Sequence, residues 1–304
     1  MWAVVMAVVL AMLWSVLGPP PMESEATGGV RTMEGSLHDV VDGFADRLPA
    51  AESDGYVTPS AEEATALAES YAAIVAGDLP TAAATAAPVG YEITRLQDTT
   101  SGRRFVLLSE PLDGRTDPTR GWGLFVFAPS ASTGTIVEVP HPVADRATED
   151  LGTDLFLAAR ARALLSAGAN RDAVAGGAAD VAHRQDSAFE AMHRATLAGG
   201  GPVVQIHGFD AQTHADAGDA VVSSGTETPG TDVRRLAEEL AAEGFRACVY
   251  DGKRCAGLGG TTNVQGSSAR DAGVEFIHLE LGADVRGDEV TSDRVTQIVA
   301  RALR

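Results

Sequence analysis

The sequence predicts an α/β protein with three layers, in which a central, mostly parallel or mixed β-sheet carries helices on both faces. In the second half of the chain, short apolar runs of strand length alternate with segments of helical periodicity. A hydrophobic fraction of 45% together with 33 glycines is typical of a globular α/β chain. Two cysteines are too few for a disulfide-dense scaffold or a zinc ribbon.

The net charge of the 304-residue chain narrows the choice of partners. Its 23 basic and 42 acidic residues give a net charge of −19. A chain this acidic lacks the basic surface that binds the phosphates of nucleic acids or of anionic lipids. We therefore expect no nucleic-acid partner, and contact with a membrane only through the N-terminal segment.

The N-terminal segment predicts export. Residues 2–17 are apolar apart from Ser15, and Gly18 and three prolines follow. This stretch is shorter than the roughly 20 residues of a membrane span and suits the core of a signal peptide. We expect residues 1–21 to be a signal peptide or membrane anchor, and the protein to be extracytoplasmic, either secreted or anchored to the cell envelope. A buried N-terminal helix is the alternative.

Residues 22–88 are expected to form a polar linker and an N-terminal helical region. One short helix is predicted within the linker at residues 37–48. The alanine-rich segment at residues 60–87 begins with Ser60 as a helix cap, and we expect Pro80 to break it into a helix and a tail.

Residues 89–304 are expected to form the α/β domain. It opens with a β-hairpin, because two strand-like apolar segments flank a turn sequence at residues 98–102. The predicted strands are 91–96, 104–108, 122–128, 135–139, 202–206, 220–222, 246–250 and 274–279. The predicted helices are 148–166, 186–197, 231–243 and 292–303.

Histidines at the ends of predicted strands indicate a metal site, because ligands of open α/β sheets bind beyond the carboxyl ends of the strands. Three of the seven histidines, His141, His207 and His278, lie at or near such ends. We expect His141 and His207 to bind one Zn²⁺ ion together with either Asp145 or Glu149 from the following turn, which leaves a position for water. The alternatives are helix capping by His141 and Asp145, a core position for His207, or a structural metal.

Glu280 is the predicted general base. It lies in an apolar strand, where a carboxylate is expensive to bury without a function or a partner. His278 lies two residues earlier on the same face of that strand and is a candidate for substrate binding. The alternative for Glu280 is an ion pair with Arg286, which is itself a candidate for substrate binding.

Arginines are expected to bind an anionic group, because a guanidinium binds a carboxylate through two parallel hydrogen bonds. Arg171 and Arg184 are the candidates for holding a substrate carboxylate or the oxyanion of the reaction. Asn170 and His183 are candidates for substrate binding beside them. The expected partner is a small molecule or peptide that bears a carboxylate, and surface ion pairs are the alternative role of these arginines.

Two features concern the last third of the chain. Cys248 and Cys255 flank a turn sequence, so export would allow a disulfide that pins a loop, whereas buried free thiols are the alternative. The glycine-rich residues 257–260 predict either a flexible loop that covers a substrate or a plain connection on the surface.

The order of these segments resembles the N-formylglutamate amidohydrolases and the phage poly-γ-glutamate hydrolases, which share the zinc carboxypeptidase-like fold. Residues 139–142 look like the Pro-His-Ser segment of the amidohydrolases. His141, followed by Asp145 and then by Thr148 and Glu149, is similar to the pattern of the poly-γ-glutamate hydrolases. The resemblance implies that Asp145 is the metal ligand and that Glu149 supports it.

The resemblance extends over residues 90–304. Residues 203–208 resemble the Asp-Ala-His-Ser strand that brings the second histidine. Residues 170–171 and 180–184 fall where the amidohydrolases carry Ser-Arg and Asp-Leu-Asn-Arg, and residues 276–281 look like their late Leu-Glu-Leu strand. By this match Glu280 occupies the catalytic position.

The sequence departs from the amidohydrolases at Pro142, where they carry Ser, and at His183, where they carry Asn. These departures and the predicted export point away from formylglutamate as the substrate. The expected function is an exported, zinc-dependent amidohydrolase or carboxypeptidase-like peptidase that cleaves an N-acyl amino acid or a γ-glutamyl peptide with metal-activated water. The alternative is a non-catalytic envelope protein that binds a ligand on the same fold.

Overall fold

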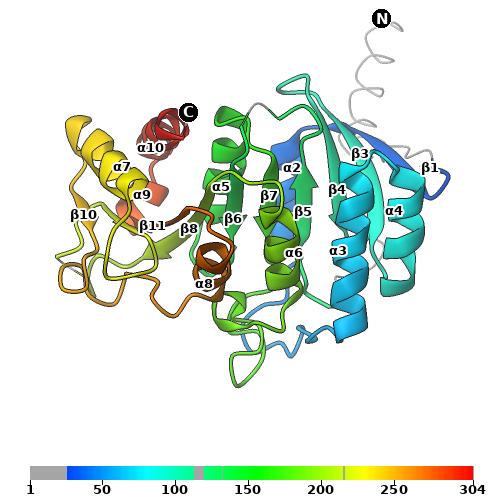
Figure 1. Cartoon of the computed structure of the whole chain (residues 1–304), viewed down its shortest axis with the longest axis horizontal. Helices are drawn as coiled ribbons and strands as arrows, with labels where there is room; N and C mark the ends of the chain where they lie inside the picture. Colours follow the sequence, from blue (N-terminus) through cyan, green and yellow to red (C-terminus); the bar gives the residue numbers. More distant parts are fainter. Residues whose placement is uncertain (1–25, 113–119, 132, 215, 304) are drawn as a thin grey trace, which may run out of the picture.

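The computed structural model describes residues 26–112, 120–131, 133–214 and 216–303. The predicted signal peptide or anchor at residues 1–21 lies outside these ranges. In the described part, one sheet of 11 strands runs across the molecule in the order β1-β2-β3-β4-β5-β7-β6-β8-β11-β9-β10 (Figure 1). Parallel and antiparallel pairings both occur in it, as the sequence predicted for a mixed α/β sheet.

Four parallel strands form the centre of the sheet. They are β7 (Ala163–Ser166), β6 (Ile136–Val139), β8 (Val203–Phe209) and β11 (Phe276–Gly282). Nearly all of their residues are buried, because helices cover both faces of the sheet. Parallel pairing brings the carboxyl ends of these strands to one edge, which is where the candidate site lies.

The remaining strands flank this centre. Beyond β11 lie β9 (Ala220–Ser223) and β10 (Ala247–Val249). On the other side lie β5 (Leu124–Phe127), β4 (Arg104–Ser109), β3 (Glu92–Asp98), β2 (Val30–Gly35) and β1 (Ala26–Thr27). The predicted hairpin is confirmed, because β3 and β4 pair antiparallel.

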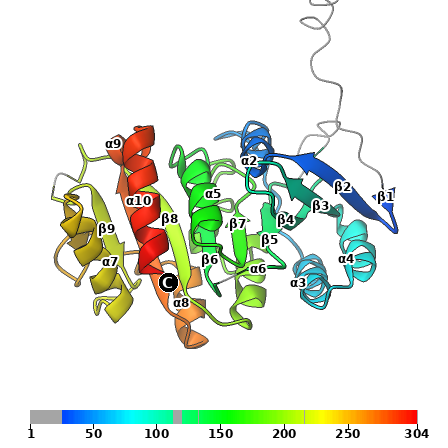
Figure 2. The same cartoon turned by 90° about the horizontal axis from the view of Figure 1, so that it is seen from above.

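Helices form the two outer layers (Figure 2). One apolar core joins the sheet to α2 (Leu37–Ala45), α5 (Thr148–Ala158), α7 (Thr231–Ala242) and α10 (Glu289–Ala302). A second core joins the opposite face to α3 (Ala61–Val75), α4 (Leu79–Ala86), α6 (Ala188–Leu197) and α8 (Val264–Asp271). Short helical turns complete the chain at η1 (Ala87–Val89), η2 (Val181–His183) and α9 (Ala283–Arg286). Within the described ranges, no helix has both the length and the apolar character needed to cross a bilayer.

The alanine-rich segment begins at the predicted cap, but its second part, predicted to be a tail, forms the helix α4. Ser60 accepts a hydrogen bond from the backbone N–H of Glu63, whose side chain accepts one from the backbone N–H of Ser60, and this capping box starts α3. Pro80 lies in the first turn of α4, where its missing N–H is tolerated. The two helices are therefore separate.

Two local predictions are wrong. The helix expected at residues 148–166 ends at Ala158, and residues 163–166 form β7 in the middle of the sheet. The run Ala-Leu-Leu-Ser is buried on both faces, so it has no alternating pattern, and its residues favour helices equally well. Residues 30–35, expected within a linker, pair with β3 as strand β2, because backbone pairing fixes a segment whose side chains are largely polar. Helix α8 has no counterpart among the predicted elements.

Candidate metal centre

Three strands and one loop bring the candidate residues together. His141 follows the end of β6, His207 lies in β8, and His278 and Glu280 lie in β11. In the register of β8 and β11, Glu280 pairs with His207, so the two side chains share one face of the sheet. Asp145 comes from the loop after His141.

Asp145 lies between the two imidazoles. Its Oδ2 is 3.4 Å from Nδ1 of His141 and 3.5 Å from Nδ1 of His207. Bonds of about 2.0–2.1 Å to one tetrahedral zinc ion put neighbouring ligand atoms about 3.3–3.4 Å apart. The two distances therefore match a shared ion, and the three side chains are almost completely buried. His207, His278 and Glu280 form a second, adjacent group of potential ligands.

Asp180 orients the first imidazole. Its carboxylate lies 2.8 Å from Nε2 of His141, so Nε2 carries a hydrogen and Nδ1 is the nitrogen turned toward Asp145. Arg171 and His183 also bond to Asp180, at 2.9 and 3.0 Å. Although burial opposes it, the hydrogen bonds from His141 and His183 hold the pKa of Asp180 well below its ordinary value. Asp180 is thus an anion that fixes the ligand geometry.

The protonation states differ between the two imidazoles. Burial lowers the pKa of His207 to about 4, so its ring is neutral near pH 7, as a metal ligand requires. Although burial opposes it, hydrogen bonds that its ring donates to the carboxylates of Asp145 and Asp180 raise the pKa of His141 above its ordinary value. Although burial also opposes it, the two neighbouring imidazoles of His141 and His207 hold the pKa of Asp145 well below its ordinary value. A cation at Nδ1 of His141 must therefore displace a proton.

Glu280 has the environment of a general base. Its side chain is buried, and its Oε2 has no hydrogen-bond partner among the described residues. Burial, aided by the charge of Asp145, raises the pKa of Glu280 to about 8. Such a group exchanges protons readily near neutral pH. Among the described residues, the side chains of Glu280 and Arg286 do not form the ion pair that was the alternative role of Glu280.

The loop that carries His141 and Asp145 is strained and held in place. Positive φ values occur at Val143 (67°), Arg146 (34°) and Ala147 (59°), in a backbone region that residues other than glycine rarely adopt. The guanidinium of Arg286 donates short hydrogen bonds to the backbone oxygens of Asp145 and Arg146. Its Nε donates to the carbonyl of Leu281, at 3.1 Å, which ties the loop to the end of β11.

Four predicted site residues have other positions. Arg286 clamps the backbone of this loop instead of binding substrate, because backbone oxygens surround its guanidinium. Glu149 accepts from the N–H of Val143, at 3.4 Å, and lies outside the ligand group. Arg184 pairs through two nitrogens with its neighbour Asp186. The side chain of Asn170 caps a local turn by accepting from the N–H of residue 172.

A polar cavity of about 400 Å³ opens over the site, and His141, Arg171, His183, His207, His278 and Glu280 all line it. Residues 257–263 form one wall of the cavity. The glycine-rich segment therefore lies beside the cavity, where a loop that covers a substrate would lie. Gly260 lies against the His278 ring so closely that a Cβ would be 2.6 Å from it. His183 contacts Thr262 of this wall at 3.1 Å.

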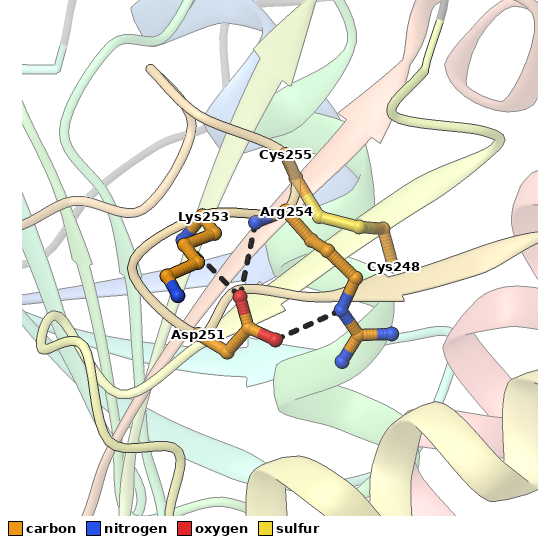
Figure 3. Close-up of a disulfide and its surroundings, with 5 residues drawn as sticks. All are labelled: Cys248, Asp251, Lys253, Arg254 and Cys255. Atoms are coloured by element: carbon orange, nitrogen blue, oxygen red, sulfur yellow. Dashed lines mark hydrogen bonds and ion pairs between the residues drawn. A yellow bond between two sulfur atoms is a disulfide. The ribbon is translucent and has the colours of Figure 1, made fainter.

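A disulfide joins Cys248, in β10, to Cys255, which lies two residues before the segment that forms this wall (Figure 3). Within the closed loop, the carboxylate of Asp251 accepts from the backbone N–H groups of Lys253 and Arg254 and from Nε of Arg254. The cysteines are therefore paired, and the free-thiol alternative is wrong.

Sequence reasoning missed the residues behind the ligands. Asp180 lies in the run 180–184 that the sequence singled out, but it was given no role. Gln205 accepts from Nε2 of His207 at 2.7 Å, and its position two residues before a histidine on one strand face was the available signal. Asn263 also contacts Gln205, and it comes from a loop that no local pattern places there.

Comparison with protein-family models finds no match. Comparison with curated proteins finds no match either.

Comparison with solved structures finds similar chains. An N-formylglutamate amidohydrolase from Ralstonia eutropha JMP134 is 14% identical, with a TM-score of 0.36 over 60% of this chain and 98% of that one. A bacteriophage poly-γ-glutamate hydrolase is 16% identical, with a TM-score of 0.39 over 57% of this chain and 84% of that one. A metallo-carboxypeptidase from Pseudomonas aeruginosa is 15% identical, with a TM-score of 0.39 over 60% of each chain. These similar chains include members of the two groups that the sequence motifs resembled, at low sequence identity.

Proposed function

We propose that the protein is a metal-dependent hydrolase that cleaves an amide bond. The observation that carries the proposal is the meeting of two buried imidazole nitrogens and one carboxylate at separations that fit a single tetrahedral ion. Three ligands leave the open position that distinguishes catalytic from structural zinc sites. His141, Asp145 and His207 would hold the ion, and Glu280 lies beside it.

When bound, a Zn²⁺ ion supplies a Lewis acid that polarises the scissile carbonyl and makes water more acidic. In its ionised form, Glu280 accepts one proton from the water as the water oxygen attacks the carbonyl carbon. It then donates that proton to the leaving nitrogen as the C–N bond breaks, which yields a carboxylic acid and an amine. The side chain returns to its starting state after each turnover.

The substrate class is also a proposal. Of the two arginines considered for anion binding, Arg171 is the one that lines the cavity, and its side chain is 34% exposed. It pairs with Asp180 through Nη2, and the same guanidinium borders the cavity beside His183. We propose that Arg171 and His183 bind a carboxylate of an N-acyl amino acid or a γ-glutamyl peptide.

Export is proposed on two grounds. The apolar N-terminal sequence has the length of a signal-peptide core, and the Cys248–Cys255 disulfide suits an oxidising compartment. Fractionation of cells that express the full chain with a C-terminal tag tests it, because a protein confined to the cytoplasm would contradict the proposal.

The function is tested by metal analysis combined with a substrate panel. Purified protein is loaded with Zn²⁺ and assayed by mass spectrometry against N-acyl amino acids and γ-glutamyl peptides. We expect one ion per chain, its loss in His207→Ala, and turnover that disappears in Glu280→Gln while the metal stays bound. Folded protein that binds no metal and cleaves nothing would refute the enzyme, and binding of these compounds without turnover would favour the ligand-binding alternative.

A further inference from the structure

A buried network of amide and carboxylate side chains lies beneath His207, on the side away from Asp145. Its members are at most 5% exposed. They are Glu138, Glu190, His193, Gln205, Asn263 and Gln265. An amide can in principle be turned either way round, so its orientation must be established from neighbours whose polarity is fixed.

The first such neighbour is the backbone carbonyl of Val181, which can only accept a hydrogen bond. Nε2 of Gln265 lies 3.1 Å from it, so this atom is the NH₂ group and Oε1 of Gln265 is turned the other way. That oxygen faces Nε2 of Gln205 at 3.3 Å. Gln205 must therefore present its NH₂ group to Gln265 and its oxygen to His207. The carboxylate of Glu138, which accepts from the same NH₂ group at 3.0 Å, favours the same orientation.

The second fixed neighbour is the backbone N–H of Gly266, which can only donate. It lies 2.9 Å from Oδ1 of Asn263, so the NH₂ group of Asn263 is turned toward Gln205. Oε1 of Gln205 is the atom that receives it. Two chains of hydrogen bonds that end on different backbone groups therefore give Gln205 the same orientation.

The orientation of Gln205 determines which nitrogen of His207 carries hydrogen. Oε1 of Gln205 is 2.7 Å from Nε2 of His207 and has no hydrogen to give, so Nε2 must donate. Nδ1 then keeps its lone pair and directs it toward the carboxylate of Asp145, 3.5 Å away. Without Gln205, the same carboxylate would attract a hydrogen onto Nδ1 and block the lone pair.

We propose that Gln205 is a positioning residue that holds His207 in the Nε2–H tautomer, and so keeps Nδ1 available to a metal ion. The role in metal binding rests on the function proposed above, whereas the tautomer is a property of the metal-free protein. Outer hydrogen bonds of this kind change metal affinity by about 10–100-fold.

The test measures the tautomer by long-range ¹H–¹⁵N correlation NMR on the metal-free full chain at pH 7.5, with His207 identified by its absence in His207→Ala. We expect the Nε2–H pattern in the unsubstituted protein and the Nδ1–H pattern in Gln205→Met, which keeps the side-chain length but cannot accept from Nε2 in the same way. Zn²⁺ affinity, measured by competition with a chelator, should fall about 10–100-fold in Gln205→Met.

The matched control is Thr296→Val, a near-isosteric loss of a buried hydroxyl that has no hydrogen-bond partner among the described residues. It should leave both the tautomer and the Zn²⁺ affinity unchanged. An Nδ1–H pattern in the unsubstituted protein overturns the inference, and needs no variant to fold. The NMR result tests the tautomer even if the protein binds no zinc. Absence of zinc binding would refute the proposed function and would leave the tautomer assignment unchanged.

Discussion

Replacing Glu280 with Gln should make the protein more stable and inactive at once. The carboxyl is buried, and burial raises its pKa to about 8, from its ordinary value of 4.5. The folded state therefore binds this proton more tightly than the unfolded state, and the free energy of unfolding falls as the pH rises from 4.5 to 8. Glutamine keeps the shape of the protonated acid and carries no charge at any pH.

The expected gain follows from the same shift. At pH 7, Glu280 ionises in the unfolded chain but not in the folded one, and this stabilises the unfolded state by about 3 kcal/mol. At pH 5 the same effect is less than about 1 kcal/mol. Glu280→Gln should thus raise the free energy of unfolding of the metal-free protein by up to about 3 kcal/mol at pH 7, and by little at pH 5. Turnover should fall by a factor of about 10²–10⁴, the contribution of a positioned general base.

Urea unfolding of metal-free protein at pH 5, 6, 7 and 8 measures the stability, and the substrate panel measures the turnover. Glu238→Gln, at an exposed position on α7, is the matched control and should change neither quantity with pH. A Glu280→Gln variant that is destabilised at pH 7, or that keeps its turnover, would show that Glu280 is not the buried base described above.

Three further predictions concern the surroundings of the ion. Arg286→Met should weaken Zn²⁺ binding at least about 10-fold, because the strained loop loses the side chain that holds its backbone. Arg184→Met breaks only an exposed ion pair and should leave Zn²⁺ binding unchanged. Competition with a chelator measures the Zn²⁺ affinity of both variants. Asp145→Asn should abolish stoichiometric zinc in metal analysis and Glu149→Gln should retain it, and the reverse result would assign the acidic ligand to Glu149. Removing the disulfide with Cys255→Ser should lower the free energy of unfolding by about 2 kcal/mol and raise KM, since the segment that leads into one cavity wall loses its covalent link. An unchanged KM would show that the disulfide does not support the site.

The sequence was sufficient where backbone register carries a side chain to its place. His207 and Glu280 lie on neighbouring parallel strands, so their shared face follows from strand periodicity and pairing. His141 comes at the end of the next strand over, and the short turn after it brings Asp145 back to the same edge. These residues could therefore be predicted as one group.

The sequence was insufficient where side-chain direction depends on distant segments. Arg286 lies one short turn beyond β11, yet it extends to backbone oxygens of the loop after β6, more than a hundred residues earlier. Arg184 pairs with Asp186, two residues further along the chain. The strand β7 was mistaken for helix because burial on both faces removes the pattern that separates the two structures.

The proposed ion between His141, Asp145 and His207 can be located in a crystal structure of the zinc-loaded protein with anomalous data at the zinc edge. We expect a single anomalous peak bonded to Nδ1 of both histidines and to the carboxylate of Asp145, at about 2.0–2.2 Å from each. A peak held instead by His278 and Glu280, or protein that crystallises in this fold and takes up no zinc, would contradict it.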